Sequence, residues 1–509
     1  MSMLNLVSAL VVLPAVQTTA TITVDATVKK SISPYIYGLN FPDWSKMGRG
    51  FTLARQGGNR MSAYNWETNA SNAGNDYQHQ NDGYMGTSNE PGWTVSNFVR
   101  PAQANGATLL LTVPAMGHVS ADKNADGDVA KTPDYLNVRF HKSFARKPGK
   151  FQYPPDLDDK LVFQDEFVAW VEKTRARNTA AWYSVDNEPD LWGSTHQRVW
   201  QKNPTYAQII SINQEYASAI KAVAPRALVF GPANYGWQGF RTFQGAPDGN
   251  GRDFLDVYLQ EMRRAELKAG KRLLDVVDIH WYPEARGDDV RIAWGEDKPG
   301  TPAARIQAPR SLWDASYVET SWIADVLGKK PIVLLPRVQA QISKNYPGTK
   351  LGISEYNYGG GKVASGLVAQ ADVLGLFGRY GVFAACNWGM SATDTAQLGG
   401  FRAYINFDGK GAKFGDTALA VAGQRPELNS VYAAVDKRNS RRLTLVAINK
   451  TKDPMSFAIA TKGFKGRRAR GFAFGAPTFE IARAVPVKVN ATINFTAAPE
   501  SVVSVEVLR

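Results

Sequence analysis

The chain has 509 residues, with 44% hydrophobic and 21% charged residues, which is ordinary for a globular protein and long enough for one large domain plus a smaller unit. Its single cysteine, Cys386, excludes an intrachain disulfide, so oxidation does not stabilise the fold. The net charge of +13 could indicate a nucleic-acid ligand, but the basic residues are spread along the chain. We therefore expect a solvated basic face and no nucleic-acid partner, with weak attraction to acidic surfaces left open.

The first residues contain an apolar run, Leu4 to Val16, that is too short to span a bilayer. The run resembles the hydrophobic part of a secretory signal, although no Lys or Arg precedes Lys29. A truncated signal, a cloning remnant or an ordinary strand would each produce it. We expect a secreted, extracellular protein that does not associate with membranes.

The chain then alternates between strands and helices. Residues 21–28 alternate apolar and polar side chains like a half-buried strand, and residues 35–40 form a buried strand that ends at Asn40. From there to about residue 420, apolar strands alternate with helix-like stretches, which predicts a parallel sheet with helical crossovers. About eight strands can be counted, so a closed (β/α)8 TIM barrel is expected. Further strands are predicted at 108–113, 181–185, 227–231, 274–283, 350–358 and 382–388, and helices at 165–173, 206–223, 254–268 and 365–380.

The pattern changes after about residue 425. Short strands at 430–435, 443–448, 456–459 and 501–507 lie between turn residues, which is typical of an all-β sandwich. The strand at 21–28 lies outside the barrel pattern and could join this sandwich. The expected class is therefore α/β: residues 1–32 contribute a strand to the sandwich, residues 33–422 form the catalytic barrel, and residues 423–509 form the β-sandwich domain.

Two of the predicted barrel strands end on a glutamate. The apolar residues 181–185 lead into Asp186-Asn187-Glu188 and stop at Pro189, and the strand from Lys350 reaches Glu355. On the strand count, Glu188 ends the fourth strand and Glu355 lies on the seventh. A carboxylate at the end of a buried strand is costly unless it has a partner or a use. Each glutamate alone could form a structural salt bridge, but the pair favours acid/base or nucleophilic chemistry.

Other polar residues follow predicted strands and should converge on the same mouth, because barrel enzymes hold their sites at the carboxyl ends of the strands. The sequence has no His/Cys set with the spacing of a catalytic zinc site and no Gly-rich phosphate loop after a strand, so paired-carboxylate chemistry remains, with glycoside hydrolysis as its leading example. Arg60 could instead be a structural counterion, His280 a satisfied core histidine and Trp388 plain core. The strand-end residues are Asn40, Arg60, Asn187, His280, Tyr282 and Trp388.

Several segments together resemble the signature blocks of glycoside hydrolase family 44. Asn-Glu-Pro alone occurs in many clan A glycosidases, but the blocks occur in order over essentially the whole chain after residue 20. The resemblance implies an eight-stranded barrel with an attached β-sandwich. It also implies retaining cleavage of internal β-1,4 links in cellulose-like glucans, with xylan, xyloglucan and mannans accepted by various members. The blocks are Ile32–Gly38, Gly58–Arg60, Tyr64–Trp66, Tyr183–Pro189, Asp278–Glu284, Gln307–Asp314 and Ile353–Gly359.

The same resemblance implies roles for individual residues. Glu188 is expected to be the acid/base and Glu355 the nucleophile. Asn187 would hold the sugar 2-hydroxyl, Trp388 would stack beneath the ring at the cleavage point, and Tyr282 would lie near the nucleophile. Burial and the neighbouring carboxylate would raise the pKa of Glu188, while Arg60 would favour an ionised Glu355. The predicted substrate-binding residues are Asn40, Arg60, Trp66, Asn187, His280, Tyr282, Trp322 and Trp388.

One loop has the oxygen-ligand spacing of a calcium site. Asp122, Asn124, Asp126 and Asp128 alternate around a turn glycine, although the twelfth position of a complete EF-hand loop is Pro133 instead of Glu. Both a surface Asp turn and a structural calcium site are consistent with this pattern. Catalysis by two carboxylates needs no cofactor.

The sequence therefore predicts a monomeric, retaining endo-β-1,4-glucan hydrolase, an endoglucanase that acts on β-1,4-linked polysaccharide by double displacement. Two alternatives stay open. The first is a xyloglucan- or xylan-specific hydrolase on the same site, because these polymers share the β-1,4 backbone and differ in their substituents. The second is a non-catalytic polysaccharide-binding protein that keeps the barrel mouth, which the presence of both glutamates disfavours.

Overall fold

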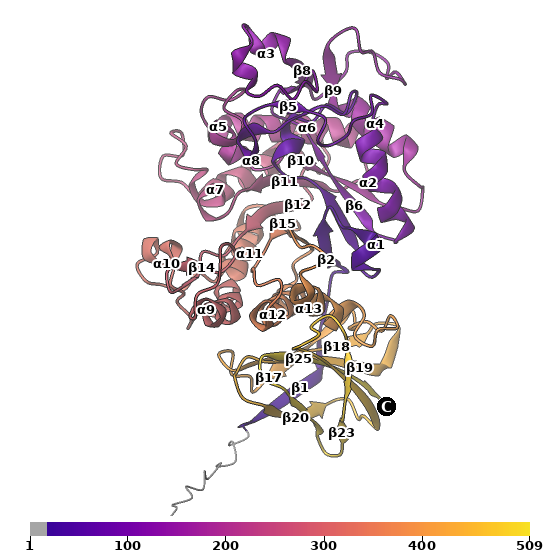
Figure 1. Cartoon of the computed structure of the whole chain (residues 1–509), viewed down its shortest axis with the longest axis vertical. Coiled ribbons are helices and arrows are strands. Elements are labelled where there is room, and N and C mark those ends of the chain that lie inside the picture. Colours follow the sequence, from indigo (N-terminus) through magenta and orange to yellow (C-terminus); the bar gives the residue numbers. More distant parts are fainter. Residues whose placement is uncertain (1–17) are drawn as a thin grey trace, which may run out of the picture.

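The computed structural model describes residues 18–509, so the apolar run Leu4 to Val16 lies outside the described residues. A barrel surrounded by helices lies above a β-sheet domain along the long axis of the molecule (Figure 1). Within residues 18–509, no helix combines the length and the apolar character needed to cross a bilayer.

Eight strands close into the predicted barrel, and every neighbouring pair is parallel. Its interior is filled by apolar side chains, with Trp182 against Tyr35 and Phe230 and with Cys386 buried among them. Glu188 directly follows the fourth strand and Glu355 lies on the seventh, as predicted. In chain order the strands are β2 (Tyr35–Asn40), β3 (Leu53–Gln56), β6 (Thr108–Val113), β10 (Ala181–Val185), β11 (Val229–Asn234), β12 (Val276–Trp281), β15 (Lys350–Tyr356) and β16 (Ala384–Asn387).

Helices connect the strands, and local sequence explains where the longest ones begin and end. Thr205 and Gln208 form a capping box at the start of α6, and Asp253 caps α8, which ends at Gly270 with a φ of +65°. The helices are α1 (Trp44–Met47), α2 (Trp93–Ala104), α3 (Tyr135–Val138), α4 (Gln164–Thr174), α5 (Trp192–Thr195), α6 (Tyr206–Val223), α7 (Trp237–Thr242), α8 (Phe254–Ala269), α9 (Thr301–Gln307), α10 (Trp322–Val326), α11 (Leu334–Asn345), α12 (Ala364–Tyr380) and α13 (Thr395–Ile405).

Small sheets lie in the connections that leave the carboxyl ends of β3, β6 and β12. The connection after β6 carries a three-stranded sheet with α3, at the upper end of the molecule in Figure 1. These long connections extend the wall around the barrel mouth, where loops carry function on a rigid scaffold. The short strands are β4 (Ser71–Asn72), β5 (Asn81–Asp82), β7 (His118–Ser120), β8 (Phe140–Phe144), β9 (Leu161–Phe163), β13 (Arg286–Gly287) and β14 (Val290–Arg291).

The second domain is one ten-stranded sheet that folds over its own apolar core. Strand β1 lies between β17 and β20, so the first described residues join the C-terminal strands (Figure 1). Strand β17 also belongs to this sheet, although the sequence placed residues 417–422 at the end of the barrel. The strands are β1 (Thr18–Ser31), β17 (Thr417–Ala422), β18 (Asn429–Asp436), β19 (Asn439–Asn449), β20 (Met455–Lys462), β21 (Arg468–Phe474), β22 (Arg483–Val485), β23 (Lys488–Val489), β24 (Ile493–Ala497) and β25 (Ser501–Leu508).

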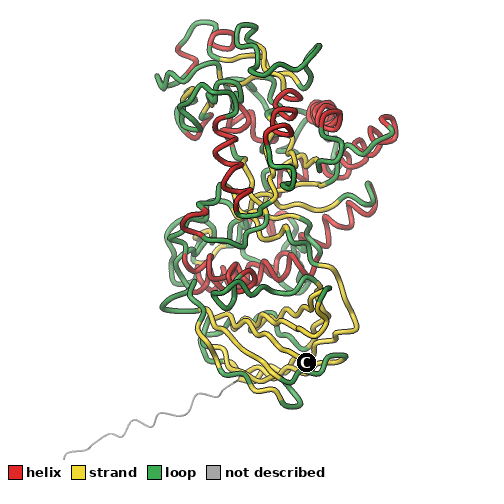
Figure 2. Tube along the Cα trace, turned by 90° about the vertical axis from the view of Figure 1, so that its right-hand side faces the viewer, coloured by secondary structure: helices red, strands yellow, loops and turns green. Residues whose placement is uncertain are grey.

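Helices α12 and α13 join the two domains. Helix α12 contacts the barrel strand β2 on one side and the sheet strands β19 and β25 on the other, and α13 packs against α12 and β25. Figure 2 shows this layer of helix between the barrel and the sheet. The interface contains a buried ion pair between Lys450 and Asp372 at 2.7 Å, and Tyr432 donates a hydrogen bond to the same carboxylate at 2.6 Å. Since an unpaired buried charge is costly, this group fixes how the barrel sits on the sheet.

Candidate active site

Glu188 is held at the barrel mouth by an unusual turn after β10. Asp186 and Glu188 have φ values of +61° and +43°, which are rare for residues other than glycine. The buried Asp186 carboxylate stabilises the turn, since it accepts hydrogen bonds from Ser62 Oγ (2.5 Å), the backbone N–H of Ala115 (2.5 Å) and that of Asn187 (2.7 Å). Backbone strain that is over-determined in this way is characteristic of functional sites.

Glu355 lies on β15 with both carboxylate oxygens hydrogen-bonded. Arg55 Nη1 donates to Oε1 at 2.7 Å, and the Tyr282 hydroxyl donates to Oε2 at 2.6 Å. Burial raises the pKa of Glu355, but the positive charge of Arg55 and the hydrogen bond from Tyr282 oppose this effect, and the pKa lies below the ordinary value. Glu355 is therefore ionised and aimed into the mouth.

Glu188 has the opposite electrostatic environment. Burial raises its pKa well above the ordinary value, and the negative charges of Glu355 and Asp190 raise it further. Two neighbouring carboxyl groups with pKa values pushed apart are the arrangement that separates an acid from a nucleophile. This environment suits Glu188 to donate a proton and Glu355 to attack as a nucleophile, the roles that the sequence predicts.

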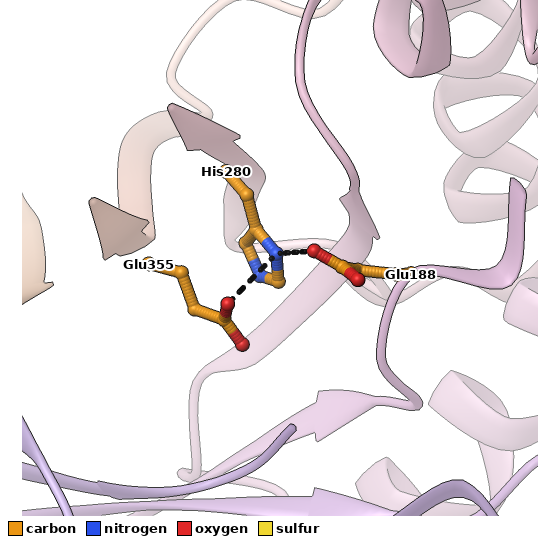
Figure 3. A group of neighbouring side chains, drawn as sticks. All are labelled: Glu188, His280 and Glu355. Atoms are coloured by element: carbon orange, nitrogen blue, oxygen red, sulfur yellow. Dashed lines mark hydrogen bonds and ion pairs between the residues drawn. The ribbon is translucent and has the colours of Figure 1, made fainter. Parts of the chain in front are cut away.

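His280 lies between the two glutamates (Figure 3). Its Nδ1 is 2.8 Å from Glu188 Oε1 and 3.5 Å from Glu355 Oε2, and its Nε2 is 3.1 Å from Ser354 Oγ. Burial lowers the pKa of His280, which favours the neutral imidazole. A neutral ring that donates from Nδ1 to Glu188 Oε1 leaves Oε2 of Glu188 to carry the acidic proton.

Glu188, His280 and Glu355 each offer one potential ligand atom, and these atoms lie within 4.8 Å of one another. Within residues 18–509, this is the one group of three His, Cys, Asp or Glu side chains close enough to hold a metal ion. A cation bound there would face the Arg55 guanidinium, which is 2.7 Å from Glu355 Oε1. One carboxylate oxygen of Glu188 and one of Glu355 thus lie within 4.8 Å of each other. This approach is closer than the roughly 6.5–9.5 Å between the carboxyl groups of inverting glycosidases and favours a covalent intermediate.

A cavity of about 1040 Å³ extends from Trp388 along the residues that follow β2 and β3 and along helix α2. Aromatic side chains line it, and Trp388 meets Phe41 edge to face at a centroid distance of 6.2 Å. Gly58 has a φ of +88°, and a Cβ there would clash with the Trp388 indole. The aromatic lining residues are Phe41, Trp44, Tyr77, Tyr84, Phe98 and Trp388.

The comparisons with known proteins agree with this geometry. A sequence profile described as "Glycoside hydrolase family 44" matches residues 70–285. The solved structure of a family 44 xyloglucanase from Paenibacillus polymyxa with xyloglucan superimposes with a TM-score of 0.91, at 34% identity over 97% of this chain and 100% of that chain. The chain belongs to glycoside hydrolase family 44.

Two curated relatives are similar over most of this chain. "Beta-mannanase/endoglucanase A" of Caldicellulosiruptor saccharolyticus is 39% identical over 458 residues, which is 84% of this chain and 34% of the relative. "Endoglucanase A" of Paenibacillus lautus is 38% identical over 459 residues, which is 86% of this chain and 64% of the relative. The family 44 chain thus spans only about a third of the first relative and under two thirds of the second.

Arg55 has the role that the sequence analysis gave to Arg60. Strand β3 ends at Gln56 and the chain then turns, so Arg60 pairs with Asp82 at 2.6 Å and lies over the Tyr84 ring at 4.3 Å. Arg60 still lines the cavity, but its proposed stabilisation of Glu355 is wrong. A signal for Arg55 was present, because a charged residue directly after the apolar Leu53 and Ala54 of a buried strand needs an interior partner.

Arg55 also organises the two predicted asparagines. Its Nη1 donates to Asn40 Oδ1 at 3.0 Å and its Nη2 to Asn187 Oδ1 at 2.7 Å. The Asn40 amide donates to the Ser354 carbonyl at 3.0 Å, so Asn40 is itself held in place and fixes the position of the Arg55 guanidinium. Within residues 18–509 the Asn187 NH2 group donates no hydrogen bond, so it is available to a sugar hydroxyl.

Two predicted tryptophans lie away from the glutamates. Trp66 is 1% exposed and packs against Phe167 and Trp170, so its predicted contact with substrate is wrong. It follows the 3-10 turn of residues 59–63, whose return into the barrel wall buries the indole. Trp322 begins α10 and packs, partly buried, against the barrel core, so its contact with substrate stays a prediction.

In the Asp-rich loop, two arginines pair with the carboxylates that a calcium site would use. Arg139 pairs with Asp122 at 2.7 Å and with Asp126 at 2.7 Å, and Arg198 pairs with Asp128 at 2.5 Å. The Asn124 backbone N–H donates to Asp122 as in an Asp turn. Because guanidinium groups already neutralise these carboxylates, Asp122, Asn124, Asp126 and Asp128 form an ion-paired surface turn.

Replacing Tyr282 with Phe should lower kcat by about tenfold to a hundredfold, with a smaller change in KM, because the hydroxyl hydrogen-bonds the nucleophile and not the remote sugars. Loss of this bond should also move the acidic limb of the pH–rate profile to higher pH, since the bond lowers the pKa of Glu355. Initial-rate kinetics across pH measure both effects. An unchanged acidic limb would contradict the role given to this hydroxyl.

Proposed function

We propose that this family 44 chain is a retaining endo-β-1,4-glucan hydrolase. The observation that carries the proposal is the pair Glu188 and Glu355, which lie close together with pKa values shifted in opposite directions. In the first step, Glu355 attacks the anomeric carbon while Glu188 protonates the leaving oxygen. In the second, Glu188 takes a proton from water, which displaces Glu355 from the glycosyl-enzyme.

The cavity beside Trp388 supports cleavage within a chain. It is open to solvent and lined by aromatic rings on which successive sugar rings can stack, so it holds several sugars beyond the cleavage point. A backbone of β-1,4-linked glucose is the proposed substrate, and the names of the relatives make xyloglucan, xylan and mannan the polymers to compare with it.

The rate should depend on pH in a bell shape. Below the lowered pKa of Glu355 the nucleophile is protonated and the rate falls, and above the raised pKa of Glu188 the acid loses its proton and the rate falls again. Arg55→Gln removes a positive charge from beside Glu355, so its acidic limb should move to higher pH. Profiles of kcat/KM for the two proteins test this, and coincident acidic limbs would contradict the electrostatic role of Arg55.

The proposed activity is tested on a panel of soluble β-1,4-glucan, xyloglucan, xylan and mannan. We expect reducing ends to appear on β-1,4-glucan together with a rapid fall in viscosity, since internal cleavage shortens chains quickly. Activity on xyloglucan or xylan alone would favour the specialised hydrolase. Binding without release of reducing ends from any polymer would favour the non-catalytic alternative.

We further propose that the protein works outside the cell as a monomer. A polysaccharide is too large to enter a cell, and the aromatic cavity and both glutamates come from one chain. Size-exclusion chromatography with light scattering tests the monomer, and fractionation of the source cells tests the location.

A further inference from the structure

A second groove lies on the β-sheet domain, at the end away from the barrel, where β20, β23 and the C-terminus meet (Figure 1). Its volume is about 980 Å³. Four cationic side chains line it: Arg441, Lys465, Arg467 and Arg509. No Asp or Glu is among the described residues that line it.

The charge of the groove is uncompensated. Arg441, Lys465 and Arg467 are exposed, and within residues 18–509 none of their side chains forms an ion pair or a hydrogen bond. Other cations of the domain do have partners, for example Arg442 and Arg470 with Glu506. Three unpaired cations therefore lie along one depression.

The β-sheet domain as a whole is basic. Residues 423–509 contain 15 Lys and Arg against 6 Asp and Glu, so they hold most of the net charge of +13. A concave surface lined by one sign of charge concentrates ions of the opposite sign. The groove is thus suited to an extended anion.

The chemistry of the lining favours one class of anion. Arginine predominates, and its planar guanidinium pairs with carboxylates through two parallel hydrogen bonds. Asn490 and Thr492 add groups that can bond hydroxyls. The one aromatic ring in the groove, Phe464, is 5% exposed with Arg509 over it at 4.9 Å, so no open face is available for a nucleobase. Ile459 and Ile493 are buried, so these large apolar side chains are not available to insert into a membrane.

We propose that this groove binds a polysaccharide whose sugars carry carboxylates, such as a polyuronate. It is separate from the catalytic cleft and does not depend on the activity proposed for that cleft. Binding there would keep the protein on a mixed, acidic polysaccharide matrix while the barrel mouth stays free for an uncharged chain.

The test uses the full chain and a fluorescently labelled oligogalacturonate, with anisotropy read at low ionic strength. Neutralising the groove with R441Q, K465Q and R467Q together should weaken binding by about tenfold or more, because each removed cation reduces the attraction for the anionic oligosaccharide. These three side chains form no ion pair or hydrogen bond within residues 18–509, so the melting temperature should not change. A matched control, R177Q, R226Q and R263Q, removes the same charge from exposed barrel positions and should change binding by less than about twofold, because exposed charges are screened.

Several results would overturn the proposal. These are no binding by the unaltered protein, an equal loss in the groove and control variants, and tighter binding of a single-stranded oligonucleotide than of the oligogalacturonate. A fall in hydrolysis of uncharged soluble β-glucan in the groove variant would contradict a separate site. Because binding is measured apart from hydrolysis, failure of the proposed glucanase activity would leave this result unaffected.

Discussion

Glu355→Gln should abolish hydrolysis of polysaccharides and of activated aryl glycosides alike. The amide has no negative charge to attack the anomeric carbon, and the nucleophile is needed in the first step whatever the leaving group. We expect kcat to fall by on the order of 10⁵-fold, the scale on which loss of a covalent nucleophile is measured. Initial rates on soluble β-1,4-glucan and on a dinitrophenyl β-cellobioside measure the loss.

The matched control for this variant is Glu215→Gln, which makes the same change at an exposed position of α6. Its rates should equal those of the unaltered protein. Glu355→Gln should also bind oligosaccharide with little loss, because the aromatic cavity is intact. Substantial residual turnover of the aryl glycoside in Glu355→Gln would contradict its assignment as nucleophile.

Glu188→Gln should lose polysaccharide hydrolysis by about 10²- to 10⁴-fold, the usual contribution of general acid/base catalysis. It should still form the glycosyl-enzyme from an aryl glycoside with a good leaving group, because such a group needs no proton. The second step then lacks its base, so the intermediate should accumulate. Added azide needs no base and should restore turnover, with a β-glycosyl azide as product.

Mass spectrometry of the quenched Glu188→Gln protein should find the glycosyl group on Glu355, and NMR of the azide product should find the β configuration. Azide rescue with retained configuration in the Glu355 variant instead would mean that the two roles are reversed. Absence of rescue in both variants would contradict the double-displacement mechanism.

The barrel and its two glutamates could be predicted because their signals are local. Residues 181–185 are apolar, the polar Asp186-Asn187-Glu188 and Pro189 follow, and this order alone places a carboxylate at a strand end. The alternation of such strands with helices then determines a closed parallel sheet. Tyr282 lies beside Glu355, as the resemblance to family 44 implied, and the contact of Asn187 with the sugar 2-hydroxyl stays a prediction.

The errors occurred where the path of the chain after a strand decides the outcome. Arg55 and Arg60 are five positions apart, and only the turn at Gly57 and Gly58 determines which of them faces Glu355. The partners of the Asp-rich loop, Arg139 and Arg198, are distant in sequence, so ligand spacing alone could not reveal that these carboxylates were already paired. Tertiary pairing of this kind is not encoded in local spacing.

The charge pattern is a third case. Arg441 lies on β19 and Lys465 lies in the connection between β20 and β21, so the basic residues look dispersed along the chain. Antiparallel pairing of β19 with β25, and of β24 with β20 and β23, brings these segments to one edge. The groove is therefore a product of topology.

The most direct test of the central assignment is the anomer released first from a β-1,4-glucan oligosaccharide, observed by proton NMR before mutarotation. Glu188 and Glu355 lie close enough for a covalent glycosyl-enzyme, so the account predicts that the β-anomer appears first and the α-anomer grows in later. First release of the α-anomer would mean that water attacks directly. That result would contradict the role of Glu355 as nucleophile.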